Sequence, residues 1–387
     1  MYTLSSKLKL TAIIFMIVGA IGLIYAFIAA PSTIEEVKEM MADDASHGSS
    51  DMEIVDQDVE IADPDHAEAD HVLVDDHENE HYEHLLHQLQ NKPWAALYIA
   101  AFFFFMIALG TLVFYALQYA AQAGWSPVLF RVMEGITAYL LPGGIIIFII
   151  LLLSGLHLNH LFIWMDPEVV ADDKLIQNKS GYLNVTFFLI RALFYLGGWN
   201  LFRYLLRRNS LRIDEDSTDN RWFKQNFKLS AGFLVFFMVT ESMMSWDWIM
   251  SLDPHWFSTL FGWYVLSSMI VSAITVIALV SIYLKSRGYL EYVNDSHIHD
   301  LAKFMFGFSI FWTYLWFSQF MLIWYSNIPE EVTYFVTRIE DYGLPFFGMV
   351  VMNFVFPILL LMNSDYKRVN LFVIMAGIIV LLGHYLD

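Results

Sequence analysis

Cysteine is absent from this chain of 387 residues, and its absence excludes two common kinds of redox centre. Iron–sulfur clusters are usually held by cysteine thiolates, and haem c is attached through a Cys-x-x-Cys-His motif. A haem bound between two histidines needs one histidine on each of two facing helices. The predicted membrane spans contain only His157, His160 and His384, and the first two lie three residues apart. No covalently bound cofactor and no bis-histidine haem is therefore expected.

Charge is also scarce, since charged residues make up 16% of the chain and hydrophobic residues 57%. This composition is too apolar for a water-soluble globular protein and predicts a polytopic membrane protein. A hydrocarbon core needs about 20 apolar residues per helix. Period-two alternation is absent, which favours helices over a barrel. We predict an all-α fold with nine spans near residues 10–30, 95–120, 136–164, 183–206, 229–250, 259–284, 304–326, 344–362 and 370–386.

The spans predict four regions along the chain. Residues 1–32 form an N-terminal anchor helix, because the apolar run after Lys7 and Lys9 is too long for a cleaved signal peptide. Residues 33–92 form an acidic segment. Residues 93–256 and 257–387 each hold four spans with short connections, which predicts two four-helix bundles beside a peripheral anchor.

The acidic segment 33–92 contains nineteen Asp and Glu, two Lys and seven His. Dense like charge favours disorder through most of it, with a helix just before the membrane in "HENEHYEHLLHQLQ". One interpretation is metal capture by His77, His81, His84 and His87, or docking of a cationic electron carrier. The plainer interpretation is a solvated acidic linker.

Positively charged residues set the predicted orientation. Alternate connections carry fifteen Lys and Arg on one side of the membrane and five on the other, while Arg191 falls inside a span. Positive charge marks the cytoplasmic side. The N-terminus is therefore predicted to be cytoplasmic, and the acidic segment and the stretch "SWDWIMSLDPHWFSTL" (245–260) to lie outside.

Ionisable side chains within spans are costly, by about 2.5–3.5 kcal/mol on insertion scales, so each needs a partner or a function. Most of those in this chain fall in the outer half of the first bundle, and the full set is Glu134, His157, His160, Arg191, Glu241 and Asp247. Imidazole next to carboxylate could accept the protons that quinol oxidation releases. The alternative is a structural ion pair between Arg191 and Glu241, with the histidines bonded to backbone carbonyls.

Helical spacing separates the two carboxylates of the fifth span. Glu241 shares a face with Ser245 and Trp248, whereas Asp247 points away from that face. A carboxylate beside Arg191 would stay ionised, and one held in apolar surroundings could pass protons. Glu241 is the candidate relay because it lies deeper.

The outer mouth of this path is predicted at Asp253 and His255, where Asp253-Pro254 ends the fifth span. Asp247 lies just inside. The primary interpretation of the nearby tryptophans is an aromatic belt at the membrane interface. Trp246 and Trp248 are secondary candidates for stacking on a quinone ring.

Two stretches, "ESMMSWDWIMSLDPHWFSTLFGWY" and "FSQFMLIWYSNIPEE", resemble the F-type integral membrane subunit of bacterial alternative complex III. The span pattern is similar from about residue 95 onward. That family is similar to the membrane subunit of polysulfide reductase and has ten spans in two four-helix bundles. The resemblance therefore implies a tenth span in addition to the nine that are visible.

The resemblance implies a location in a bacterial inner membrane and a role in a respiratory quinol:cytochrome c, or quinol:terminal oxidase, oxidoreductase that uses menaquinol or ubiquinol. It places haem c and iron–sulfur clusters in partner subunits: a multihaem cytochrome c, an iron–sulfur protein and a homologous quinol-binding membrane subunit. This chain would then conduct protons and act as a scaffold within membrane lipid, with no nucleic-acid partner. A proton-coupled secondary transporter and a purely structural scaffold are the alternatives.

Overall fold

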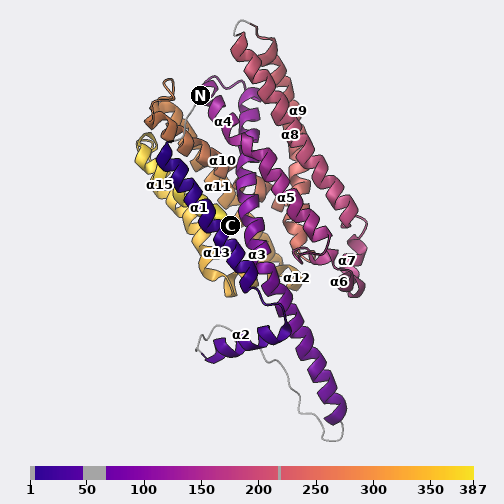
Figure 1. The fold of residues 1–387 in the computed structure, drawn as a ribbon. Helices are drawn as coiled ribbons and strands as arrows, with labels where there is room; N and C mark the ends of the chain where they lie inside the picture. The colour runs from indigo at the N-terminus through magenta and orange to yellow at the C-terminus, as the bar shows by residue number, and fades with distance from the viewer. Residues whose placement is uncertain (1–4, 47–66, 217–218) are drawn as a thin grey trace. The chain divides into compact units, whose positions relative to one another are not determined.

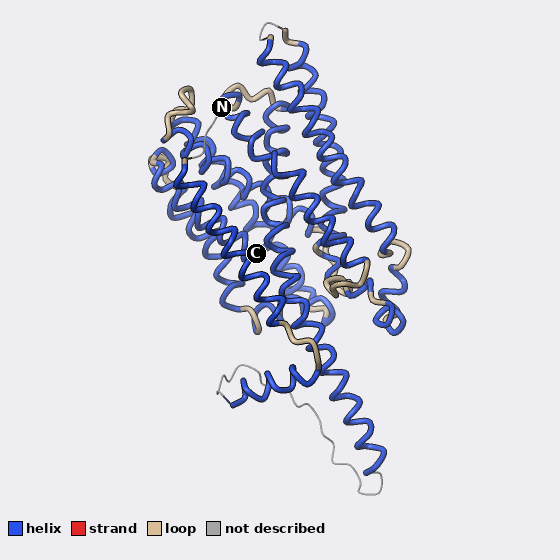
Figure 2. Tube along the Cα trace, in the orientation of Figure 1, coloured by secondary structure: helices blue, strands red, loops and turns tan. Residues whose placement is uncertain are grey.

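The computed structural model describes residues 5–46, 67–216 and 219–387, and the side chains of residues 42–81 and 84 lie outside that description. All regular secondary structure in these residues is helical, as Figure 2 shows. Together with the apolar length of its helices, this confirms an all-α polytopic membrane protein.

The helices follow one another along the chain as Figure 1 shows. In order they are α1 (Ser6–Ala29), α2 (Ile34–Ser46), α3 (Ala67–Ala120), α4 (Phe130–Ile136), α5 (Leu140–Gly155), α6 (Pro167–Asp172), α7 (Lys174–Lys179), α8 (Val185–Glu215), α9 (Arg221–Trp248), α10 (Phe261–Ser286), α11 (Asp295–Ser326), α12 (Pro329–Glu340), α13 (Gly343–Val350), α14 (Phe356–Leu361) and α15 (Asn370–Leu386). A π-helical turn, Val351–Val355, joins α13 to α14.

Eight helical segments among the described residues are long and apolar enough to cross a membrane. They are α1, Leu85–Ala120, Pro127–Gly155, α8, Arg221–Leu252, α10, α11 and Gly343–Leu361. Each overlaps one of the first eight predicted spans. The ninth predicted span corresponds to α15, which is apolar but shorter, at 17 residues.

The third span differs from its prediction of 136–164. It begins at Pro127 and ends at Gly155, so its helix stops before either histidine. Leu156 is the C-cap, and His157 adopts a left-handed backbone with φ +58°. A left-handed residue just past the C-cap commonly ends a helix. The apolar run therefore overestimated the helix at this end, because hydropathy does not register a helix stop.

The chain folds as two compact units. The first holds the residues up to Ile99 together with His157–Leu161. Within it no residue of α1 is buried, as expected of an anchor that faces lipid. The edge of Phe27 meets the Trp94 ring at 5.0 Å between centroids, and Gln90 donates a hydrogen bond to the carbonyl of Pro31.

The acidic segment 33–92 is more helical than predicted. Residues 34–46 and 67–92 are helical, whereas 47–66 lie outside the described residues, as do the side chains of His77, His81 and His84. Glu36 accepts hydrogen bonds from the backbone N–H and the hydroxyl of Ser32, and these bonds lower the pKa of Glu36. Acidic residues in the first turn favour α2 through the helix dipole, a local effect that overall charge density did not reveal.

The second unit holds Ala100–Leu156 and Phe162–Asp387. In it α8 packs against α5 and α9, while α10 contacts α9, α11 and α15. The buried half of α3 contacts both groups, since Phe105 meets Trp199 and Phe114 meets Phe304. Gly110 lets α3 approach α10, because a Cβ there would lie 2.7 Å from the carbonyl oxygen of Met269. The division of these helices into two four-helix bundles stays a prediction.

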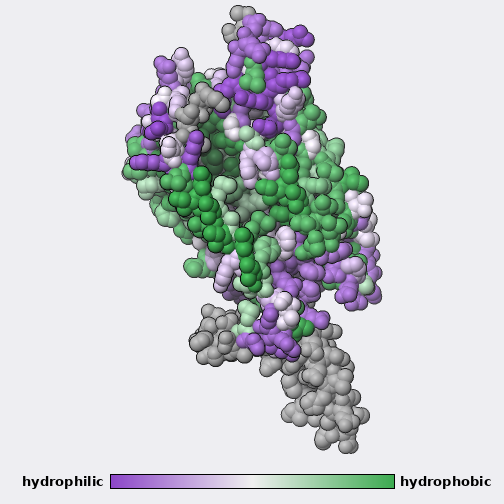
Figure 3. Space-filling model, viewed as in Figure 1, coloured by the Kyte–Doolittle hydropathy of each residue, from purple (hydrophilic) through white to green (hydrophobic). Residues whose placement is uncertain are grey.

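The surface of the second unit is apolar along its helices and polar at their ends, as Figure 3 shows. The hydrophilic residues gather where α8 turns into α9, and the hydrophobic flank lies along the same two helices. This is the distribution that a hydrocarbon layer between two aqueous phases requires.

Candidate functional site

The centre of the candidate site is a buried ion pair between α8 and α9. Arg191 donates from Nε to Oδ2 of Asp247 at 2.8 Å and from Nη2 to Oδ1 at 2.9 Å. The side chains are 5% and 0% exposed. The Tyr195 hydroxyl donates to the same carboxylate at 3.0 Å. In this geometry the carboxylate accepts two hydrogen bonds from the guanidinium and one from a third donor. These bonds offset most of the free energy that it costs to remove the two charges from water.

The start of α8 positions the arginine. Asn184 caps this helix by accepting from the N–H of Phe187 at 2.9 Å. Arg191 lies two turns further on and donates to the Tyr182 carbonyl at 3.1 Å. Its guanidinium carbon is 4.0 Å from the centre of the Tyr182 ring and 4.3 Å from that of Phe187. Burial and the nearby Asp247 carboxylate raise the pKa of the Tyr182 phenol, so the phenol stays neutral.

Aromatic rings surround the pair. Trp248 is fully buried, and its ring centre is 6.1 Å from those of Tyr195 and Trp199. Trp199 in turn donates to the Thr240 hydroxyl at 2.9 Å. Trp246 is instead 37% exposed, because residues two apart point to opposite sides of a helix. The two predicted quinone-stacking rings therefore do not form one wall, although quinone contact by either stays a prediction.

Glu241 lies deeper on α9 and is 1% exposed. Its Oε1 atom has no hydrogen-bond partner among the described residues, and the hydroxyl of the adjacent Ser242 is its polar neighbour. Six residues separate it from Asp247, which is about 9 Å along a helix. The antiparallel register places Asp247 beside Arg191 and Thr240 beside Trp199. The interpretation of Arg191 and Glu241 as a structural pair is thus wrong, since Arg191 pairs with Asp247.

The predicted mouth is a network of surface residues. His255 Nε2 lies 2.5 Å from Asp173 Oδ2, and the His255 N–H donates to Asp253 at 3.2 Å. Lys179 donates to the carbonyl of Pro254 at 2.5 Å. Burial lowers the pKa of Lys179, while the nearby Asp253 and Asp173 oppose that effect. Asp253 and His255 therefore lie together with charged groups of the 166–180 connection, which sequence spacing did not predict.

The two candidate histidines lie apart from this set along the chain, in the first compact unit. His157 is exposed. The backbone N–H of His160 donates to Asn91 Oδ1 at 2.9 Å, and its ring centre is 4.4 Å from that of His87. The expectation that both occupy the outer third of the third span is wrong, because that helix ends at Gly155.

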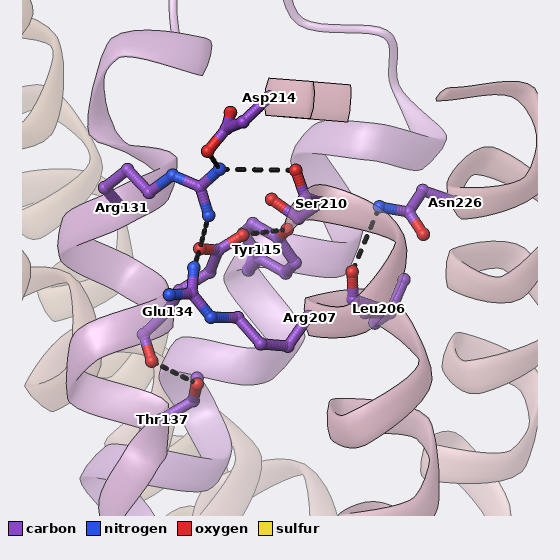
Figure 4. Close-up of polar contacts among 9 residues, drawn as sticks. All are labelled: Tyr115, Arg131, Glu134, Thr137, Leu206, Arg207, Ser210, Asp214 and Asn226. Carbon is purple, nitrogen blue, oxygen red and sulfur yellow. Dashed lines mark hydrogen bonds and ion pairs between the residues drawn. The ribbon is translucent and has the colours of Figure 1, made fainter. Parts of the chain in front are cut away.

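Figure 4 shows a polar cluster at the predicted cytoplasmic end of the second unit. Glu134 is buried and accepts from the Tyr115 hydroxyl at 2.8 Å and from Arg131 at 2.5 Å. Arg207 also binds Glu134, and Arg131 also binds Asp214. Glu134 was predicted to be one of the intramembrane charges, without a predicted partner. The useful signal was Arg131, three residues earlier on the same helical face.

A second missed cluster lies among α10, α11 and the C-terminal end of α15. The Asp387 carboxylate accepts from Trp312 at 3.0 Å, from Ser268 at 3.2 Å and from the Tyr264 hydroxyl. His384 Nδ1 is 3.3 Å from Asp387 and 3.0 Å from Ser268. The signal was a histidine in the last turn of an apolar helix and an aspartate three residues later, at its C-cap. Glu134 and Asp387 are therefore both hydrogen-bonded carboxylates with little exposed side chain.

Among the described residues, no group of three or more His, Asp or Glu side chains could hold a metal ion. His87 is the one member of the predicted metal-capturing histidines whose side chain is described. Neither the family models nor the curated proteins contain a match to this chain.

Proposed function

We propose that this integral membrane protein is the proton-conducting and scaffolding subunit of a respiratory quinol:cytochrome c, or quinol:terminal oxidase, oxidoreductase. The resemblance of residues 241–264 and 317–331 to the alternative complex III subunit suggests the complex. One structural observation carries the proton-conducting role: Glu241 is a buried carboxyl that pairs with no cation among the described residues, on the same helix as the paired Asp247.

The two carboxyl groups of α9 suit different tasks. Asp247 is held by three donors and compensates the charge of Arg191, so it orders the site. Glu241 has no such compensation from the part of the chain that the structure describes, and an unpaired buried charge is costly. A group of this kind exchanges protons more readily than one locked in an ion pair, which makes Glu241 the relay in this proposal.

The proposed route runs from Glu241 past the ion pair to the mouth. Asp247 and Tyr195 lie within hydrogen-bond distance of each other, and Tyr182 links Arg191 to the connection before α8. Beyond it, Asp173, Asp253 and His255 exchange protons with the aqueous phase. The step of about 9 Å between Glu241 and Asp247 requires water.

Replacing Glu241 with Gln tests the proposal. Glutamine preserves the volume and removes the titrating proton. The complex is expected to assemble with its haems, while proton release linked to quinol oxidation falls. Glu340→Gln is the matched control, because Glu340 ends α12 at an exposed position, and it should release protons at the parental rate.

Two results would contradict parts of the proposal. Parental proton release by the Glu241→Gln variant would leave a structural scaffold as the function. Purification without any multihaem cytochrome, together with solute transport by the chain alone, would instead indicate a proton-coupled secondary transporter.

A further inference from the structure

The arginines near the turn between α8 and α9 differ in whether they have partners. Arg131 and Arg207 are neutralised by Glu134, and Arg131 also by Asp214 (Figure 4). Arg208 is the next residue along α8. Its Nε atom is buried and has no hydrogen-bond partner among the described residues. Arg208 also forms no ion pair among the described residues, so this part of the chain leaves its charge without a carboxylate.

Arg208 continues the lipid-facing stripe of α8. Residues spaced three, four or seven apart make up this stripe, and each of its apolar members is more than half exposed: Ile190, Phe194, Leu201 and Tyr204. Four residues after Tyr204, the same face reaches Arg208, whose guanidinium lies 5.9 Å from the Tyr204 ring centre. An arginine there places its stem on the apolar surface and its charge at the level of lipid headgroups.

Further cations lie beyond Arg208 at the same end of the hairpin. The guanidinium of Arg212 is 4.2 Å from the centre of the Trp222 ring, and that of Arg221 is 5.3 Å from it. Tryptophan favours the boundary between headgroups and hydrocarbon. The hydrophilic end of the hairpin adjoins its hydrophobic flank (Figure 3).

We propose that Arg208 and Arg212 bind the phosphate of an anionic glycerophospholipid whose acyl chains lie along the stripe of Ile190, Phe194, Leu201 and Tyr204. Guanidinium groups bind phosphate oxygens through paired N–H donors, and basic pockets on the cytoplasmic side of membrane helices bind anionic headgroups. Lipid binding at this site does not depend on proton conduction through Glu241. A result that contradicts one of the two proposals therefore leaves the other unaffected.

The test uses the full chain, with any subunits that purify with it, in phosphatidylcholine nanodiscs. Phosphatidylglycerol is titrated in, and bound lipid is counted by native mass spectrometry. Each cation near the surface contributes about 1 kcal/mol to anionic lipid binding, so R208Q/R212Q should bind phosphatidylglycerol about 30-fold more weakly. If that variant does not assemble, R208Q alone should bind about 5-fold more weakly.

The control is R287Q/R368Q, which removes two exposed arginines from the same predicted side of the membrane. It should bind phosphatidylglycerol as the parent does. Equal loss in the control would show general surface attraction, and undiminished binding by R208Q/R212Q would show that these arginines hold no lipid. Displacement of the lipid by millimolar inorganic phosphate would identify a phosphate site in place of a lipid site. Each of these three results overturns the proposal.

Discussion

Replacing Asp247 with Asn should destabilise the protein more than most single substitutions would. Arg191 is 5% exposed, and its two-point contact with Asp247 is its only ion pair among the described residues. Asparagine has nearly the same volume but no charge, so the guanidinium is left buried and uncompensated. The Tyr195 hydroxyl also loses a charged acceptor.

The size of the effect follows from breaking a buried pair. Removal of one partner costs about 3–5 kcal/mol, whereas replacement of both by apolar residues of similar volume is often close to neutral. Asp247→Asn should therefore lower the free energy of unfolding by about 3–5 kcal/mol. The double variant R191M/D247L should lose less than either R191M or D247L alone.

The assay is reversible unfolding in mixed detergent–dodecyl sulfate micelles, read by circular dichroism, for the parent, R191M, D247L, the double variant and D247N. A double-mutant cycle isolates the coupling between the two side chains. Strictly additive single effects, or a change below about 0.5 kcal/mol for D247N, would refute the argument that this pair is buried and interdependent.

Two further predictions concern packing and the outer mouth. Gly110→Ala places a Cβ 2.7 Å from the Met269 carbonyl oxygen and should destabilise by about 1–3 kcal/mol, whereas Gly307→Ala, with nothing within 4 Å, should be neutral or stabilising in the same unfolding assay. Burial raises the pKa of Asp173, but the N–H groups of Ile176 and Leu175 and the His255 ring outweigh it, so the net pKa is lowered. Asp173 thus stabilises the folded state above its unfolded pKa, and this contribution disappears as pH falls through the lower folded pKa. Thermal midpoints of Asp173→Ala should stay below the parental value from pH 7 to 5, and the difference should narrow only below about pH 4. A difference that is largest below pH 4 would contradict this.

The predictable features of the candidate site were local ones. Arg191, Glu241 and Asp247 could be predicted as site residues because charged side chains inside apolar helices are costly. The helical repeat alone predicted that Glu241 and Asp247 lie on separate faces. The partners of these side chains could not be predicted from the sequence. Arg191 could have paired with either carboxylate, and the register of α8 against α9 places it beside Asp247. His157 and His160 were misplaced because a left-handed residue ends the helix within a continuous apolar run.

The sequence by itself determined the membrane class and the approximate position of eight spans, because the transfer of apolar side chains into hydrocarbon depends on composition and length alone. Tertiary structure alone decided which buried charges are compensated. Glu134 gathers two arginines, Asp387 gathers a tyrosine, a serine and a tryptophan, and Oε1 of Glu241 has no partner among the described residues. These contacts join residues as far apart as 123 positions in the chain, and hydrogen bonds act only over about 3 Å, so only the packing of the helices could bring them together.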